Sequence, residues 1–120
     1  MHEFSIAREM MNHILREINR YKVRRIKEVY IEIGDMTMIN TEQLVFALHS
    51  IATGSIAEGM RINIKRIPLK IRCKNNHVNE ISYNEDEPFS FLIDLRCPDC
   101  DGGVSIEGGN ECIIKKIVAE

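Results

Sequence analysis

The sequence predicts an α+β fold, in which two helices and a small mixed β-sheet form one domain and a ribbon-like domain is inserted before the last strand. Two segments carry apolar residues at helical spacing, and three carry the pattern of strands. Between the last two strands lies a turn-rich segment with two short-spaced pairs of metal-ligand residues. We therefore expect residues 1–69 and 110–120 to form the α/β domain and residues 70–109 to form the inserted domain.

The first helix is predicted over residues 5–20, where apolar side chains recur at helical spacing and Ser5 can cap the first turn. The apolar positions are Phe4, Ala7, Met11, Ile14, Leu15 and Ile18. After this helix, Val29, Ile31 and Ile33 alternate with polar residues before Gly34-Asp35. This alternation predicts a half-buried strand that ends in a turn.

The second helix is predicted to begin at Asn40-Thr41-Glu42-Gln43, with Asn40 as the N-cap and Gln43 in the capping-box position. Apolar residues then line one face up to Gly54. Residues 62–67 form a strand that Pro68 interrupts, and residues 111–119 form the last strand, which we expect to return to the first sheet.

The inserted segment contains Cys73-x3-His77 and Cys97-x2-Cys100, separated by 19 residues. Two short-spaced pairs of thiolate and imidazole ligands are typical of a tetrahedral structural zinc site. The alternatives are a disulfide among these cysteines and a thioredoxin-like redox pair at Cys97 and Cys100. A redox Cys-x-x-Cys normally opens a helix, whereas this one continues into the turn sequence Asp101-Gly102-Gly103. We therefore predict Zn(2+) bound by all four side chains.

Composition predicts a compact cytoplasmic protein. The chain has 120 residues, 44% of them hydrophobic, with no apolar stretch long enough to span a membrane and no pattern of a signal peptide. Thiols stay reduced in the cytoplasm, which favours metal binding over disulfides. Residues 70–109 hold four basic and eight acidic side chains, so this ribbon lacks the basic face that nucleic acid requires. We expect neither nucleic acid nor a membrane among the partners.

A basic cluster of Arg20, Lys22, Arg24, Arg25 and Lys27 lies where the first helix should end. Cations are favourable near a helix C-terminus, and we interpret the cluster as such cations continuing into a solvated loop.

The tripeptide Met1-His2-Glu3 offers a second candidate metal site. A free amine, the backbone nitrogen of His2 and its ring nitrogen can chelate one cation in fused rings. Nickel(II) and copper(II) favour this nitrogen-rich, square-planar arrangement, and zinc does not. Methionine sulfur prefers copper(I), which would suit a copper chaperone, but we interpret Met10, Met11, Met36 and Met38 as packing residues.

These features together resemble the HypA/HybF family of nickel-insertion accessory proteins in hydrogenase maturation. The resemblance extends over the whole chain and includes the Met1-His2-Glu3 start, the strand before Gly34, the cysteine segment and Gly109-Asn110-Glu111 before the last strand. It implies a metallochaperone with no enzymatic activity. By the same resemblance, the protein is expected to carry Ni(2+) as transient cargo, to contain structural Zn(2+), and to cooperate with a maturation GTPase that helps load the large subunit of nickel-iron hydrogenase.

Carried over by residue, the resemblance implies nickel ligands at Met1, His2 and Glu3, and zinc ligands at Cys73, Cys97 and Cys100. The family's second cysteine falls on Asn76 here, so we assign the fourth zinc ligand to His77, with a water molecule as the alternative. Cys112 is predicted to be a buried thiol. The alternative function is a zinc-ribbon adaptor that binds proteins without delivering nickel.

Overall fold

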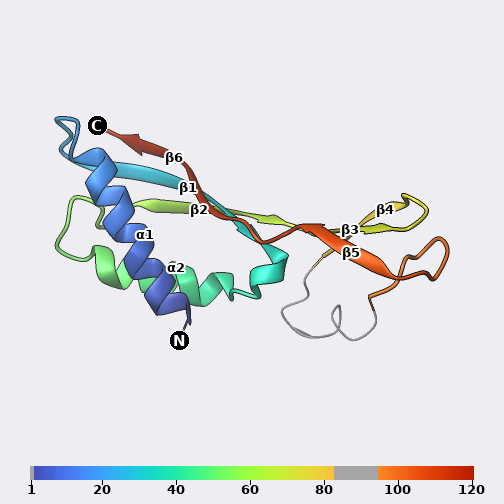
Figure 1. Ribbon diagram of the computed structural model, residues 1–120. Coiled ribbons are helices and arrows are strands. Elements are labelled where there is room, and N and C mark those ends of the chain that lie inside the picture. Colours follow the sequence, from blue (N-terminus) through green and yellow to red (C-terminus); the bar gives the residue numbers. More distant parts are fainter. Residues whose placement is uncertain (1, 83–94) are drawn as a thin grey trace. The chain divides into compact units, whose positions relative to one another are not determined.

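The protein is described by a computed structural model that covers residues 2–82 and 95–120 (Figure 1). Within these residues the chain forms two helices, a short 3-10 turn and six strands, which confirms the predicted α+β class. In chain order the elements are α1 (His2–Ile18), β1 (Ile26–Gly34), η1 (Asp35–Thr37), α2 (Thr41–Ala52), β2 (Arg61–Ile67), β3 (Leu69–Cys73), β4 (Val78–Ile81), β5 (Val104–Gly108) and β6 (Cys112–Ala119).

One sheet has the strand order β2-β1-β6, so the last strand returns to the first sheet as predicted (Figure 1). Backbone hydrogen bonds join Arg25 to Glu120 and Gly34 to Glu111, which makes β1 and β6 antiparallel. β2 runs in the same direction as β1 and is reached through α2, the usual way of connecting parallel neighbours. The sheet is therefore mixed.

The two helices bury their apolar faces against this sheet. Fully buried side chains include Met11 and Ile14 of α1, Leu44 and Leu48 of α2, and Ile31 of β1. These are the positions that the helical and alternating periods of the sequence predict. Neither helix in the described chain has both the length and the apolar character needed to cross a bilayer.

Helix α1 begins earlier than predicted. It starts at His2, so Ser5 lies inside the helix and does not cap it. Glu3 supplies the negative charge that a first helical turn favours. The predicted end at residue 20 is also late by two residues, because Asn19 and Arg20 form a turn after Ile18.

The start of α2 confirms one half of the predicted capping box. The side-chain oxygen of Asn40 accepts a hydrogen bond of 2.9 Å from the backbone N–H of Gln43. The reciprocal bond has a different partner, because the backbone N–H of Asn40 donates to the carboxylate of Glu3 at 3.0 Å. A side chain of α1 thus completes the cap of α2, and this bond fixes the beginning of α1 beside the beginning of α2.

The second sheet has the order β4-β3-β5 and is antiparallel throughout. Among the described residues of this unit, Leu69 and Ile71 of β3 are buried, and partly buried side chains pack against them. These are Met36, Met38, Ile81, Leu95 and Val104. Two of the methionines therefore serve as packing residues, and Met10 and Met11 are buried in the helical layer.

The contacts between residues divide the chain into two compact units. The first contains Met1–Glu32, Ile39–Lys65 and Ile113–Glu120, and the second contains Ile33–Met38 and Arg66–Cys112. The segment 33–38 therefore groups with the ribbon, although the sequence places it between β1 and α2. The backbone N–H of Met36 donates to the carbonyl of Gly109 at 2.6 Å, and any Cβ at Gly34 would clash with that same carbonyl. This close approach of two backbones requires glycine.

A buried ion pair ties segment 33–38 to the ribbon unit. Asp35 is 3% exposed, and its carboxylate accepts a hydrogen bond of 2.7 Å from Nε of Arg66. We predict that Asp35→Ala lowers the free energy of unfolding by about 3 kcal/mol, because it leaves a largely buried guanidinium without its carboxylate. Chemical denaturation of the metal-loaded protein would measure this change.

Glu107→Ala is the matched control for that experiment. Glu107 forms an ion pair with Arg72 in the same unit, but both side chains are at least one-third exposed, and solvent screens such pairs. We expect a much smaller effect than for Asp35→Ala. Equal losses for the two variants would show that burial does not set the contribution of the Asp35 pair.

Candidate metal centre

Two tight turns position the four predicted ligands of the ribbon. Cys73 ends β3. Its backbone N–H donates to the carbonyl of His77 at 3.1 Å, and its carbonyl accepts from the backbone N–H of Asn76 at 3.0 Å. Asn76 takes the left-handed conformation that closes this turn, with φ of 64°. In the second turn, the N–H of Asp101 donates to the carbonyl of Cys97 at 2.7 Å. Each turn therefore directs two ligand side chains to the same place.

The ligand atoms of Cys73, His77, Cys97 and Cys100 all lie within 4.8 Å of one another. Nδ1 of His77 lies 3.4 Å from Sγ of Cys73 and 3.5 Å from Sγ of Cys97, and the Sγ atoms of Cys73 and Cys100 are 3.7 Å apart. A tetrahedral zinc ion with ordinary bond lengths would have edges of about 3.5 Å between nitrogen and sulfur and about 3.8 Å between sulfurs. The donor set thus fits a tetrahedral ion such as zinc.

Backbone amides favour thiolates in this cluster. The N–H groups of Asn75 and His77 point at Sγ of Cys73, at 3.3 and 3.4 Å. At Cys100 the hydrogen bond from the backbone N–H of Gly102 is the main cause that lowers the pKa of the thiol to about 6. Burial instead raises the pKa of the Cys97 thiol. A bound cation would reverse that effect, since it stabilises the deprotonated sulfur.

No disulfide joins the cysteines of the cluster. All four cysteines are free thiols, and the 3.7 Å between the sulfurs of Cys73 and Cys100 far exceeds a disulfide bond of about 2.0 Å. Cys112 lies outside the cluster. The prediction that Cys112 is buried is wrong: it begins β6, a strand at the edge of its sheet, and its side chain is exposed.

Polar residues around the cluster were not predicted from the sequence. The side-chain amide of Asn75 approaches Sγ of Cys100 at 3.7 Å, and that of Asn79 donates to the carboxylate of Asp99 at 3.3 Å. These residues link the two ligand turns. Nothing in their spacing along the chain indicates this role, because each bond joins segments at least 20 residues apart.

Of the predicted nickel ligands, Met1 lies outside the described residues. His2 is the first residue of α1 and is exposed. The first four N–H groups of a helix have no acceptor within it, so the backbone nitrogens of His2 and Glu3 are not committed to helical hydrogen bonds. The carboxylate of Glu3 is engaged by the N–H of Asn40, which is the main cause that lowers its pKa.

Known proteins are similar to this sequence over its full length. A family model described as hydrogenase/urease nickel incorporation metallochaperone, HypA, matches residues 1–119. The chain belongs to the HypA family. The hydrogenase maturation factor HypA of Methanothermobacter thermautotrophicus is 31% identical over 121 residues, with 100% of this chain and 98% of the relative covered. That of Methanococcus vannielii is 35% identical over 126 residues, with the same coverage.

The fold is also shared with solved HypA structures. The solution structure of the nickel metallochaperone HypA from Helicobacter pylori matches with a TM-score of 0.62 at 18% identity, covering 98% of this chain and 96% of that one. Another solution structure of a HypA protein matches with a TM-score of 0.66 at 19% identity, covering 100% and 97%. Membership of the HypA family confirms the predicted function, a metallochaperone for nickel in hydrogenase maturation rather than an enzyme.

The cluster geometry predicts that removing one sulfur ligand releases the metal. We expect Cys97→Ser to lose its metal ion and to unfold the β4-β3-β5 sheet, because metal binding supplies much of the folding free energy of such small units. The His77→Ala variant should bind the metal more weakly. Its metal should no longer be coordinated by three sulfurs and one nitrogen. Metal analysis and X-ray absorption at the zinc edge would measure both effects.

Cys112→Ser is the matched control, since it removes an equivalent thiol outside the cluster and should leave the metal content unchanged. If His77→Ala kept an unaltered sulfur-plus-nitrogen spectrum, another group would occupy the fourth position.

Proposed function

We propose that this HypA protein binds nickel(II) through the amine of Met1, the ring and backbone nitrogens of His2 and the backbone of Glu3. The observation that carries the proposal is the position of His2 at the first residue of α1. Amides deeper in a helix donate to carbonyls of the preceding turn, whereas those at its start do not. A metal can therefore bind these nitrogens without breaking the helix.

The helix end also favours the chemistry that nickel needs. Nickel(II) in a square-planar field of nitrogens displaces the proton of a peptide amide, leaving a negative nitrogen. The N-terminus of α1 carries a partial positive charge, which stabilises negative charge placed there. These two effects act on the same atoms.

Glu3 acts as a positioning residue in this proposal. Its carboxylate accepts the hydrogen bond from Asn40, so it contributes to nickel binding through its backbone rather than through its side chain. The same bond holds the first turn of α1 against the cap of α2 and limits the motion of His2. A fixed imidazole loses less conformational entropy when the metal binds.

The second metal in the proposal is structural zinc(II), bound by Cys73, His77, Cys97 and Cys100. The distances among these ligand atoms support it, as does the choice of thiolate and imidazole, which zinc prefers. A water molecule in place of His77 is the competing arrangement, but Nδ1 of His77 lies within 3.5 Å of two ligand sulfurs. Zinc would hold the two ligand turns of the ribbon unit together.

The nickel proposal predicts that His2→Ala abolishes nickel binding while the protein keeps its zinc. An uncleaved extension before Met1 should have the same effect, because it converts the amine into an amide. Native protein should show the visible absorption of low-spin, square-planar nickel(II), and titration of each variant would follow that band.

His13→Ala is the control, because His13 is an exposed histidine on the same helix. It should leave the nickel titration unchanged. Tight binding of one nickel by the extended protein would rule out the amine as a ligand and favour the zinc-ribbon adaptor.

We propose that the nickel passes to the large subunit of a nickel-iron hydrogenase with the help of a maturation GTPase, in the cytoplasm. The naming of the relatives as hydrogenase maturation factors supports the hydrogenase part. The surface that begins α1 carries His2 and should meet the GTPase. There Phe4 is 46% exposed, and the guanidinium of Arg8 lies 5.5 Å from the centre of its ring.

Arg8→Glu should weaken the complex with the GTPase without changing zinc content, since it reverses the charge beside the nickel end. Arg16→Glu makes the same charge change in the last turn of α1 and should have little effect. Pull-down of the GTPase at low protein concentration would compare the two variants. Equal binding by both would place the GTPase elsewhere.

A further inference from the structure

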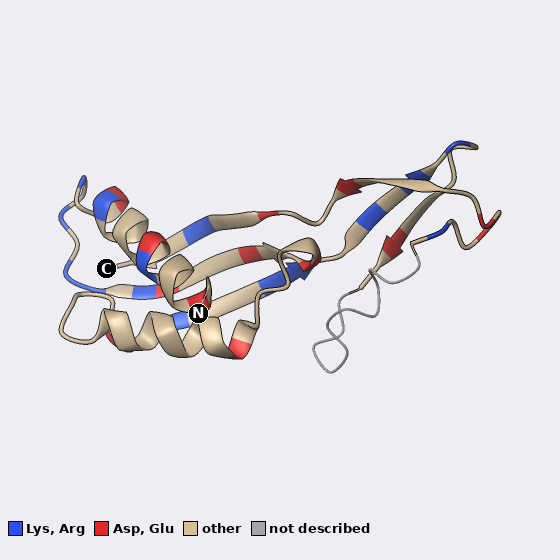
Figure 2. Cartoon of the chain, turned by 60° about the horizontal axis from the view of Figure 1, so that its bottom comes forward, with Lys and Arg blue, Asp and Glu red and all other residues tan. Residues whose placement is uncertain are grey.

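The basic cluster of the sequence lies in the turn between α1 and β1 and at the start of β1. From Arg20 to Lys27 the chain contains five cationic residues and no acidic one, and all five are exposed. In Figure 2 this turn is the run of blue segments where α1 leads into β1. The whole chain has a net charge of −2, so the positive charge is concentrated locally.

Stabilisation of the helix end explains only part of this cluster. Helix α1 ends at Ile18, and the effect of its dipole falls off within the last turn. Arg20 lies close enough to benefit, and it also pairs with Glu17 at 3.8 Å. Arg24, Arg25 and Lys27 lie further along the chain, and another reason is needed for them.

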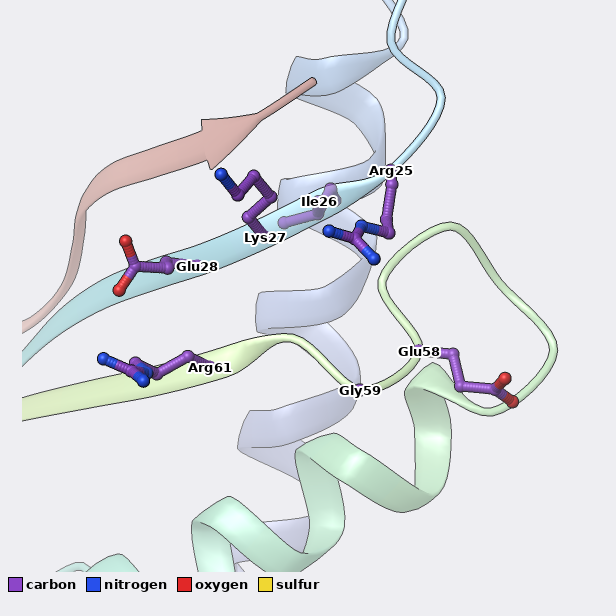
Figure 3. A pocket seen from close by; sticks show the side chains of 7 residues that line it. All are labelled: Arg25, Ile26, Lys27, Glu28, Glu58, Gly59 and Arg61. Carbon is purple, nitrogen blue, oxygen red and sulfur yellow. The ribbon is translucent and has the colours of Figure 1, made fainter.

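The structure adds a sixth cation to the cluster. A hollow of about 370 Å³ is lined by residues 25–28, which enter β1, and by Glu58, Gly59 and Arg61, which enter β2 (Figure 3). Because β1 and β2 run side by side in the same direction, Arg61 joins Arg25 and Lys27 at this hollow. All of these residues belong to the first unit.

The two acidic residues of the hollow already have hydrogen-bond donors. Glu28 accepts bonds from the hydroxyl of Tyr30 at 3.4 Å and the amide of Asn63 at 3.5 Å, and Glu58 accepts from the N–H of Gly54 at 2.9 Å. Arg25 pairs with Glu120 at 3.1 Å, but both side chains are more than half exposed, so solvent screens this pair. An incoming carboxylate can therefore compete for Arg25 at small cost.

We propose that this basic surface, formed by Arg24, Arg25, Lys27 and Arg61, docks an acidic segment of a partner protein. Guanidinium groups bind carboxylates through two parallel hydrogen bonds, which suits a peptide with spaced glutamate or aspartate side chains. A uniform polyanion such as nucleic acid fits less well, because Glu28 lines the same hollow and repels phosphates placed opposite it. The mixture of charges thus selects a segment with gaps between its acidic residues.

This surface and the nickel end lie at opposite ends of α1. The helix has 17 residues and is about 25 Å long, so a partner held at the basic surface leaves His2 free. The docking site stands whether or not His2 carries nickel, and the two can be tested separately.

The test is fluorescence anisotropy of the zinc-loaded full chain with a labelled peptide of alternating glutamate and serine. We expect binding that weakens as salt rises. Arg25→Glu/Arg61→Glu should weaken it roughly tenfold or more, because it replaces both guanidinium groups with carboxylates. Lys65→Glu/Lys115→Glu makes the same change in net charge at two exposed residues outside the hollow and should leave binding nearly unchanged.

Circular dichroism and zinc content would establish that both double variants fold. Equal binding of the matched peptide with glutamine in place of glutamate would overturn the proposal, as would equal loss in the two double variants. Tighter binding of a single-stranded oligonucleotide or of phosphatidylglycerol vesicles through Arg25 and Arg61 would also overturn it in favour of those ligands.

Discussion

The meeting of four ligand atoms from two distant turns is the constraint on which the ribbon unit depends. Among the residues that the structure describes, the buried centre of its apolar cluster is formed by Leu69 and Ile71. Backbone hydrogen bonds within the two ligand turns direct their thiols toward one another. A tetrahedral cation can then join β3 to the segment before β5 and contribute to the folding free energy of the unit.

The α/β unit is stabilised in the ordinary way, by apolar faces of α1 and α2 buried on a mixed sheet. The start of α1, the proposed nickel end, is held by a longer-range bond from Asn40 to Glu3. That bond replaces the local partner that a capping box would supply, and it joins two helix starts. The proposed nickel end is thus supported by the cap of the second helix, while the opposite end of α1 carries the basic surface.

The sequence could predict those features that depend on local periodicity or on ligand chemistry. The helical spacing around Met11 and Ile14 predicts α1, and the Cys73, His77, Cys97 and Cys100 spacings predict the cluster, because each pair must converge from one turn. Features decided by distant contacts could not be predicted. The backbone N–H of Asn40 donates to Glu3 of the other helix and not to Gln43. Cys112 is exposed on β6, a strand at the edge of its sheet. The hollow at Arg61 arises only when β1 and β2 become neighbours.

The grouping of Ile33–Met38 with the ribbon affects how the protein can be divided. A fragment cut at residues 70 and 109 would lose Met36 and Met38, which pack against Leu69 and Ile71, and would lose Leu69 itself. It would also leave the ion pair of Asp35 and Arg66 outside the fragment. The ribbon is continuous in space but discontinuous in the chain. An isolated version that keeps its native packing must therefore be assembled from two peptide segments or rejoined by a designed linker.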